Sequence, residues 1–465
     1  MLKIKFLGAA KCVTGSCHMV TIEDINILFD CGLFQSHDES DYENEELKFD
    51  PKDIDFVILS HSHVDHSGRI PLLYKKGYEG RVICTKPTVD LSECLLKDAA
   101  KIQGEDTYFE NLERQKKDME PLQPLYEMKD VEEAIKHFEG FDYEEEIKLT
   151  DNIKLKFHDA GHILGSAICE LIISSSKGEI TRVVFTGDIG NTNKDILKDP
   201  QTGLKADYLI MESTYGDRSH NDKDVYPEFL EIARSTMEAG GNLIIPCFSL
   251  GRTQEIIYML NKFVEDGKLK GCSVYVDSPL ASSLTDIFKK YEEYFDRAAQ
   301  RLIAKGDDPL NFNGLHFVKT NEEAEEVQSV KEKAIIIVAG GLHDGGRVAN
   351  HLKNNLTREE CGIIVTSYQG RASIGSKLLK GEKNVRVSGE NLEVKAKVHY
   401  IGGLSCHADK EGLFQWIESL EKSPSKVFLV HGEEENIQCF NEKLVQSGYD
   451  AITVDYMQEI ELEYN

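Results

Sequence analysis

Short apolar segments separated by glycine, aspartate and proline dominate the first part of the chain and indicate β-strands. Most of them are rich in valine, isoleucine or phenylalanine, which are enriched in strands. A helical pattern covers residues 88–116, and the strand pattern resumes after an acidic connection that contains proline. This part is therefore expected to be β-rich, with strands at residues 3–6, 19–22, 25–29, 56–59, 82–84, 153–157, 167–173, 183–186 and 208–211.

The rhythm changes between residues 217 and 383, where helical and strand patterns alternate. Alternation of this kind predicts an α/β domain with a parallel sheet. After residue 385 the chain returns to extended segments and then to one more helix, so one domain is expected to be interrupted by another. The predicted helices are 226–239, 253–264 and 436–447, and the predicted strands are 242–246, 273–276, 334–338, 362–366, 392–401 and 426–430.

One cluster of polar residues lies directly after an apolar strand pattern. The run from His61 to His66 reads His-Ser-His-Val-Asp-His and follows the segment 55–60. Imidazole and carboxylate groups at this spacing can face two neighbouring ions, with His61 and His63 toward one and Asp65 and His66 toward the other. The run predicts a dinuclear metal site.

One loop cannot complete two metal shells, so further ligands are expected at other strand ends. His162, Asp188 and His407 each follow a predicted strand. Asp30 also ends a strand, and we interpret it as a carboxylate that orients a ligand without binding metal itself. For His343, His351 and His431 we leave open whether they line a cleft, and we favour a structural role.

Composition and charge limit the possible functions. The chain has 465 residues, 40% of them hydrophobic, and a net charge of -27. This is typical of a folded, soluble protein of enzyme size, with two to four domains or one large domain that carries an insertion. Such a negative charge repels phosphate polymers, so a nucleic acid substrate would need a local basic groove or metal ions.

The cysteines and the N-terminus bear on the cellular compartment. Eleven cysteines are scattered singly and form no Cys-x-x-Cys pair, which is typical of reduced thiols in a cytosol. The apolar stretch before Lys11 is too short for a signal peptide, and no run is long enough to span a membrane. We therefore expect a cytoplasmic protein with no membrane partner.

Together these motifs resemble the metallo-β-lactamase superfamily, and a second set narrows the resemblance to its β-CASP branch. The first set is Asp30, the His61–His66 run, His162, Asp188 and a late histidine. The second set comprises Glu212, the stretch 245–255, the stretch 277–281 and the Ser-x-His-Ala-Asp run that contains His407. The resemblance extends over nearly the whole chain.

This resemblance implies an α/β fold with three parts. An αββα metallo-β-lactamase sandwich formed by residues 1–216 and 384–465 would be interrupted by a parallel-sheet β-CASP domain at residues 217–383. The active site would then lie in the seam between the two domains.

The resemblance also implies two Zn²⁺ ions. One would be bound by His61, His63 and His162, the other by Asp65, His66 and His407, with Asp188 bridging them. Glu212 would be a nearby carboxylate that does not bind metal. The residues expected to take part directly in catalysis are then Asp65, Asp188, Glu212 and His407.

The implied activity is that of a ribonuclease that hydrolyses single-stranded RNA with metal-activated hydroxide. The branch includes the endonuclease of pre-mRNA 3′-end cleavage and bacterial and archaeal relatives, so we expect an endonuclease that can also act from a 5′ end. In this family the late motif carries histidine in RNA-processing members. His407 matches that position, which favours RNA as the substrate.

Two departures from the family pattern affect the expected substrate contacts. Lys377 stands where the family has a histidine that is the presumed general acid, and the loop 340–347, with His343, replaces a serine- and glycine-containing loop. Arg252 and Arg347, each beside glycines, are candidates for phosphate contacts. Lys377 and His343 complete the set of possible RNA contacts.

Two other functions remain open. The chain could hydrolyse a small ester or thioester, although such an enzyme needs no second α/β domain. It could instead be a catalytically weak subunit of an RNA-processing assembly, although all seven ligand positions are intact. An RNA-processing partner or a homodimer also remains open.

Overall fold

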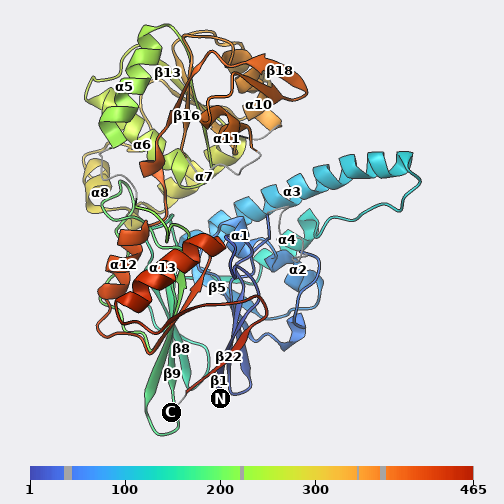
Figure 1. Ribbon diagram of the computed structural model, residues 1–465, viewed down its shortest axis with the longest axis vertical. Helices are drawn as coiled ribbons and strands as arrows, with labels where there is room; N and C mark the ends of the chain where they lie inside the picture. The colour runs from blue at the N-terminus through green and yellow to red at the C-terminus, as the bar shows by residue number, and fades with distance from the viewer. Residues whose placement is uncertain (36–43, 220–224, 343–344, 367–372, 464–465) are drawn as a thin grey trace. The chain divides into compact units, whose positions relative to one another are not determined.

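The computed structural model describes residues 1–35, 44–219, 225–342, 345–366 and 373–463. The chain divides into two compact units, shown in Figure 1. Unit 1 comprises Met1–Asn193, Asp199–Ser219 and His407–Asn465, and unit 2 comprises Lys194–Lys198 and His220–Cys406. The second unit is thus inserted into the first.

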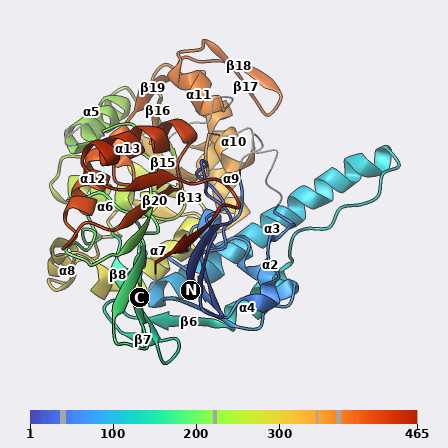
Figure 2. The same cartoon turned by 60° about the horizontal axis from the view of Figure 1, so that its bottom comes forward.

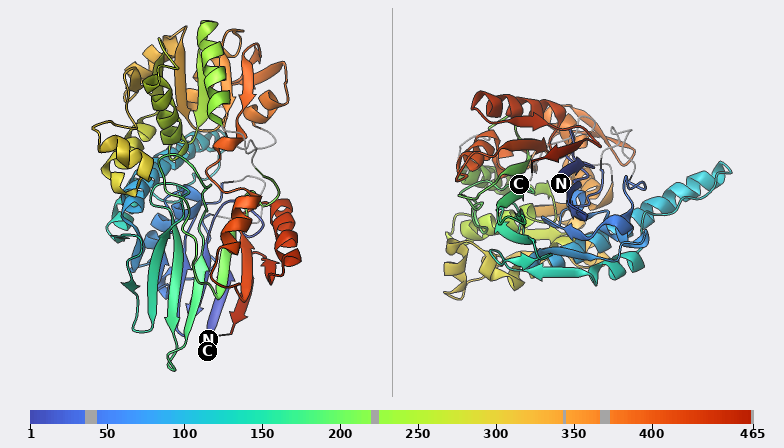
Figure 3. Two further views of the ribbon diagram at one scale, coloured as in Figure 1. Left: turned by 90° about the vertical axis from the view of Figure 1, so that its left-hand side faces the viewer. Right: turned by 90° about the horizontal axis from the view of Figure 1, so that it is seen from below.

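Unit 1 contains two seven-stranded sheets, visible in the left view of Figure 3. In the first sheet β3, β4 and β5 run parallel, and in the second β10, β11 and β20 run parallel. The first sheet has the order β22 (Glu459–Leu462), β1 (Leu2–Phe6), β2 (His18–Ile22), β3 (Ile25–Phe29), β4 (Phe56–Ile58), β5 (Arg81–Thr85) and β6 (Phe138–Phe141). The second has the order β21 (Ala451–Thr453), β20 (Lys426–Val430), β11 (Tyr208–Glu212), β10 (Ile180–Phe185), β9 (Ala167–Ser174), β8 (Ile153–Asp159) and β7 (Ile147–Lys148).

Alternation along the strands explains why these two sheets stack. In β11, Tyr208 and Ile210 belong to the core between the sheets, whereas Leu209 and Met211 pack with helices on the outer face. Successive side chains of a strand point to opposite faces, so both faces of this strand are buried. The first sheet is covered by α2 (Ile70–Lys75) and α3 (Lys86–Lys116) with α4 (Met128–Ile135), and the second by α12 (Lys410–Glu418) and α13 (Glu434–Gln446). The predicted αββα sandwich is confirmed.

Unit 2 is built on one parallel six-stranded sheet. Helices α9, α10 and α11 pack on one face of this sheet. Leu243 and Ile335, whose side chains point to the other face, are also buried, so both faces are covered. The sheet has the order β14 (Leu315–Phe317), β13 (Ser273–Asp277), β15 (Ala334–Ala339), β12 (Leu243–Cys247), β16 (Gly362–Val365) and β19 (Lys397–Tyr400). The helices are α5 (Val225–Glu238), α6 (Arg252–Glu265), α7 (Pro279–Lys290), α8 (Arg297–Ile303), α9 (Asn321–Ser329), α10 (Gly346–Asn355) and α11 (Ile374–Leu379), and a hairpin pairs β17 (Asn384–Val387) with β18 (Glu390–Glu393).

The return from unit 2 to unit 1 lies later in the chain than the sequence pattern placed it. Residues 384–406 were assigned to the metallo-β-lactamase part, but they belong to unit 2. The reason is β19, which pairs in parallel with β16 and forms the edge strand of the β-CASP sheet. An extended segment looks the same in sequence whichever sheet it joins.

The described residues also form the short 3₁₀ helices η1 (Pro51–Asp53), η2 (Glu292–Tyr294) and η3 (Gly402–Leu404). Among the residues that the structure describes, no helix is long and apolar enough to cross a membrane.

Candidate metal centre

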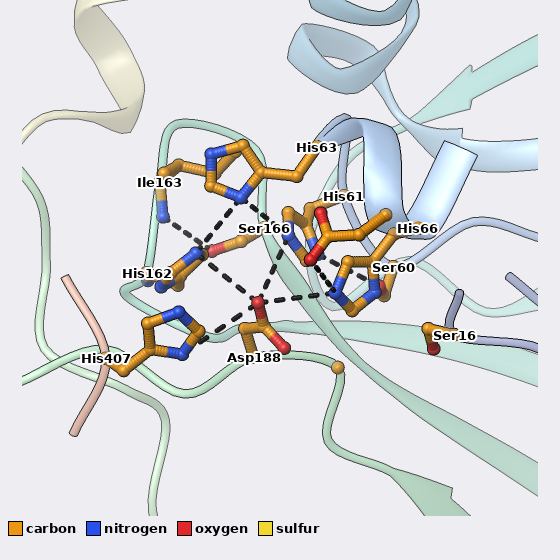
Figure 4. A network of polar contacts seen from close by, with 12 residues as sticks. Ser16, Ser60, His61, His63, His66, His162, Ile163, Ser166, Asp188 and His407 are labelled. Carbon is orange, nitrogen blue, oxygen red and sulfur yellow. Dashed lines mark hydrogen bonds and ion pairs between the residues drawn. The ribbon is translucent and has the colours of Figure 1, made fainter. Parts of the chain in front are cut away.

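The polar residues of the motifs gather at the carboxyl ends of the strands of unit 1. His61 and His63 follow β4, Asp188 follows β10 and His431 follows β20. The short helix α1 (Val64–Ser67) carries Asp65 and His66, and His162 lies in the loop between β8 and β9. Parallel strands bring their carboxyl ends to one edge of a sheet, which is why residues far apart in sequence meet here (Figure 4).

A first group of metal-binding atoms comes from His61, His63, His162 and Asp188. One donor atom from each lies within 4.8 Å of the others. Nδ1 of His63 is 3.1 Å from Nε2 of His61 and 3.3 Å from Nε2 of His162. Oδ2 of Asp188 is 3.4 Å and 3.5 Å from those two Nε2 atoms. Three imidazole nitrogens and a carboxylate oxygen match a tetrahedral zinc site.

A second group of the same kind comes from Asp65, His66 and His431. Nε2 of His431 is 3.0 Å from Nε2 of His66 and 3.5 Å from Oδ2 of Asp65. Asp188 lies beside this group as well, because its Oδ2 is 3.3 Å from Nε2 of His66. One carboxylate therefore contacts both groups, as a bridging ligand must.

The second group corrects the ligand set implied by the sequence, which contained His407 in place of His431. His407 precedes α12, and its Nδ1 is 3.9 Å from Oδ2 of Asp188. Among the described residues, no group of donor atoms within 4.8 Å of one another contains it. The late histidine that joins Asp65 and His66 is His431. His431 directly follows strand β20, as Asp188 follows β10, but this signal alone does not separate it in the sequence from His407, which also follows a predicted strand.

His407 instead pairs with Glu212, the last residue of β11. Nδ1 of His407 is 3.2 Å from Oε1 of Glu212. Glu212 is completely buried, and it accepts hydrogen bonds from the backbone N–H of Ile189 at 2.6 Å and of Thr214 at 3.3 Å. These bonds fix the carboxylate, and the carboxylate in turn holds the His407 ring beside Asp188.

Asp30 holds His66 in a similar way. Its Oδ2 lies 2.7 Å from Nδ1 of His66 and accepts a hydrogen bond from the Ser16 hydroxyl at 3.1 Å, and its Oδ1 accepts one from the Ser60 N–H at 2.8 Å. Asp30 has φ of 57° and His431 has φ of 53°. Non-glycine residues seldom adopt this conformation, and strain of this kind is concentrated at functional sites.

The centre combines histidines that are neutral at neutral pH with a carboxylate that stays ionised. Burial lowers the pKa of His61 and His162 well below the ordinary value and that of His63 to about 4, so these rings keep a lone pair at neutral pH. Burial opposes charge on Asp188 too, yet the surrounding histidines His431, His66 and His407 hold its pKa well below the usual range.

The pKa values of His66 and His407 are raised, unlike those of His61, His63 and His162. Burial disfavours a charged His66, but the carboxylates of Asp188, Asp30 and Asp65 outweigh this effect and raise its pKa. For His407, Glu212 and Asp188 outweigh burial and raise the pKa to about 9. In the absence of a metal ion, protons on these rings supply the positive charge that the buried carboxylates require.

The residues present fit a pair of divalent metal ions. Oδ1 of Asp188 and Nδ1 of His162 are buried and form no hydrogen bond with any residue that the structure describes. Nδ1 of His431 lies 3.6 Å from this Oδ1, beyond hydrogen-bond distance, and a buried carboxylate oxygen without a hydrogen bond is costly unless a cation balances it. The donor atoms are those that zinc prefers, and lone pairs on His61, His63 and His162 are already available.

The candidates for RNA contacts all come from unit 2 or from residues outside the described ranges. Nη1 of Arg252 is 3.3 Å from Oε2 of Glu255, and Nη1 of Arg347 donates to the buried Asp277. Lys377 is half-buried on α11. His343 lies outside the described residues. Their contacts with a substrate stay a prediction, and Arg347 already has a structural partner.

Comparison with known proteins decides the family. Three family models match in turn: the Metallo-beta-lactamase superfamily domain at residues 19–209, the Beta-Casp domain at 253–378 and the Zn-dependent metallo-hydrolase RNA specificity domain at 391–454. The chain is 34% identical to Ribonuclease TTHA0252 from Thermus thermophilus over 97% of each chain. The chain belongs to the β-CASP branch of the metallo-β-lactamase superfamily. The predicted family and the class of metal-dependent hydrolase are confirmed.

Other relatives are similar to this chain at comparable identity. Transcription termination factor FttA from Methanocaldococcus jannaschii is 32% identical over 93% of this chain and 67% of its own length. An RNase J-like protein from the same organism is 31% identical over 93% of each chain. The crystal structure of a protein of unknown function from Enterococcus faecalis covers 99% of this chain with a TM-score of 0.54 at 15% identity, a likeness of fold alone.

The hydrogen bond between Asp30 and His66 leads to a testable prediction. Replacing Asp30 by asparagine removes the charge that orients His66, and we expect the affinity of the second metal group to fall by about 10- to 100-fold. Zinc titration against a competing chelator measures this affinity. Asp55→Asn is the matched control, because Asp55 also accepts a backbone N–H at 2.8 Å but lies outside the centre. Equal affinities in the two variants would contradict the assigned role.

Proposed function

We propose that this protein is a zinc-dependent ribonuclease that hydrolyses phosphodiester bonds of single-stranded RNA. The observation that carries the proposal is the pair of donor groups that share Asp188. Two ions held in this way suit in-line displacement at phosphorus, where both the attacking and the leaving oxygen need stabilisation. Similarity to Ribonuclease TTHA0252 over nearly the whole chain supports RNA as the substrate.

The metal ligands in this proposal are His61, His63 and His162 for one Zn²⁺ and Asp65, His66 and His431 for the other, with Asp188 shared. When bound, these ions would supply positive charge to the phosphodiester and lower the pKa of a water molecule. Asp30 orients His66 through Nδ1, and Glu212 orients His407 through its Oε1.

His407 is the group of this chain placed to give a proton to the leaving oxygen. Its Nδ1 faces Glu212, so we assign the donated proton to Nε2. A general acid must lie within hydrogen-bond reach of the departing oxygen, and the His407 ring lies next to the centre, with its Nδ1 3.9 Å from Oδ2 of Asp188. This assignment replaces the role that the sequence suggested for Lys377.

Burial of the centre supports a flexible, single-stranded substrate. His61 is completely buried, and Asp188 is 2% exposed. A stiff duplex cannot bring its backbone into such a site as readily as a single strand can. With a net charge of -27, the protein must attract RNA locally, through the metal ions and nearby cations. We propose an endonuclease that can also act from a 5′ end.

We also propose that the protein works in the cytoplasm. All eleven cysteines are free in the structure, as expected for a reducing compartment.

An assay with two substrate classes tests this function. The zinc-loaded protein is incubated with end-labelled single-stranded RNA, the same RNA as a duplex, and a panel of thioesters and lactones. We expect RNA fragments from the single strand and no ester turnover. Ester turnover without RNA fragments would assign the chain to small-molecule hydrolysis, and neither product with two bound zinc ions would indicate a subunit without catalytic activity.

A further inference from the structure

The longest helix of unit 1 continues well beyond the body that it packs on. The first half of α3 is anchored by buried residues that include Leu91, Leu96 and Ala100, and no residue of α3 after Ala100 is buried. Figures 1 and 2 both show this second half projecting away from the sheets of unit 1. We refer to residues 101–127, which form the projecting half of α3 and the segment that returns along it, as the arm.

The arm carries large apolar side chains in water. Ile102 is 49% exposed, Phe109 is 63% exposed and Leu112 is 40% exposed. Together with Glu105 and Lys116 they follow the heptad spacing of a coiled coil, so the five side chains form one stripe along the helix. The return segment is tied to the helix at Asn111, whose side chain bonds the backbone of Leu122 in both directions.

Such a stripe is costly unless something covers it. A helix of about this length is marginal in water without tertiary packing, and Gly104 weakens it further. Contiguous exposed apolar side chains mark interaction sites. The arm therefore needs an occupant that offers apolar side chains at helical spacing.

The charges on the arm select a second copy of the same helix. Residues 105–110 contain three acids and no base, whereas residues 114–117 contain three bases and no acid. Two identical helices packed antiparallel would place the acidic part of each against the basic part of the other. The whole arm has seven acids against four bases, which does not suit RNA as the occupant.

We propose that the arm is a dimerisation element, in which α3 pairs with α3 of a second copy about a two-fold axis between Phe109 and Leu112. In an antiparallel coiled coil the two apolar positions of the heptad face one another, so Phe109 meets Leu112 of the second copy. The same register brings Glu105 to Lys116 of the second copy. Because the interface is isologous, each contact occurs twice.

A hollow on the arm fits this register. It has a volume of about 600 Å³, lies beside Gly104, and is lined by Glu105, Tyr108 and Glu127 among others. A side chain at Gly104 would contact nothing within 4 Å, so the surface is open there. In the proposed dimer the basic end of the second helix lies opposite this hollow, where its cationic side chains can form ion pairs with Glu105 and Glu127.

Sedimentation velocity of the full-length protein over a range of concentrations tests the pairing. We expect a weak dimer with Kd on the order of 10 μM, because a single helix pair buries little area. Phe109→Asp should raise this Kd by about 100-fold or more by placing charges at the axis. Ile180→Asp is the matched control, because Ile180 is 49% exposed on β10 and lies outside the arm. A wild-type protein that stays monomeric, or two variants that dimerise equally, would overturn the proposal.

Charge exchange tests the register itself. Glu105→Lys and Lys116→Glu should each weaken self-association by about fivefold or more, because each variant places like charges together twice. Mixing the two variants should restore a dimer, since each heterodimer contact then joins opposite charges. Failure of the mixture to associate would reject this register. If Phe109→Asp weakened RNA binding and left the molecular mass unchanged, the arm would be an RNA contact and the dimer would be rejected.

Discussion

Asp188→Ala is expected to lose both metal ions and almost all RNA cleavage. Oδ2 of Asp188 lies within 3.5 Å of ring nitrogens in both groups, at His61, His66 and His162. Its removal takes a ligand from each ion at once. The rate of single-turnover cleavage should fall by about 10³-fold or more, which corresponds to roughly 4 kcal/mol of transition-state stabilisation. Metal content by elemental analysis and cleavage of end-labelled RNA measure the two effects.

Asp207→Ala is the control for loss of an aspartate near a strand of the same sheet. Asp207 precedes β11 and accepts a hydrogen bond from the Arg182 N–H at 2.7 Å, so its loss affects the fold without touching the centre. This variant should keep its metal and its activity. An Asp188→Ala protein that retained two ions under zinc-replete conditions would contradict the bridging role, and one that retained fast cleavage would contradict the proposed mechanism.

The ligand loop could be predicted from sequence because its residues are consecutive. His61, His63, Asp65 and His66 follow one apolar strand, so their proximity needs no knowledge of the fold. His162 and Asp188 were found by a weaker argument, their position after predicted strands. The structure brings both residues into one cluster with the loop, because the strands that precede them in the second sheet end near the end of β4 in the first.

The choice between His407 and His431 could not be made in the same way. Both follow segments that look extended, and His407 lies in the more conspicuous run, Ser-x-His-Ala-Asp. What separates them is the strand that precedes each one. β20 pairs with β11 inside the second sheet of unit 1, whereas β19 belongs to the sheet of unit 2. Strand pairing is a long-range property. It separates His431 from His407, and it places the return to unit 1 at His407 and not at residue 384.

The pattern of apolar residues also failed to predict short strands at the sheet edges. β6 and β22 close the two ends of the first sheet, yet each has only four residues and includes glutamate. A strand that is half exposed at an edge need not be apolar, because only one of its faces is buried. The central strands, which are buried on both faces, were predicted to within a few residues.

A final pair of variants should separate metal binding from proton transfer. His431→Ala is expected to lower the metal content, because His431 faces Asp65 and His66. His407→Ala is expected to keep both ions and still lose about 10²- to 10⁴-fold in cleavage, the range that general acid catalysis supplies. Lys377→Ala tests the alternative donor and should keep both the metal content and the pH dependence of cleavage, since the proton is assigned to His407.

The pH dependence distinguishes proton donation by His407 from a structural role. Because Glu212 and Asp188 outweigh burial and raise the pKa of His407 to about 9, the ring holds its proton at neutral pH and loses it as the pH rises through that value. Cleavage by the wild type should therefore fall on the alkaline side, and bound metal ions would move this limb to lower pH by repelling the proton. The limb should disappear in His407→Ala. Loss of metal in His407→Ala would make His407 a metal ligand, and disappearance of the alkaline limb in Lys377→Ala would return the role of general acid to Lys377.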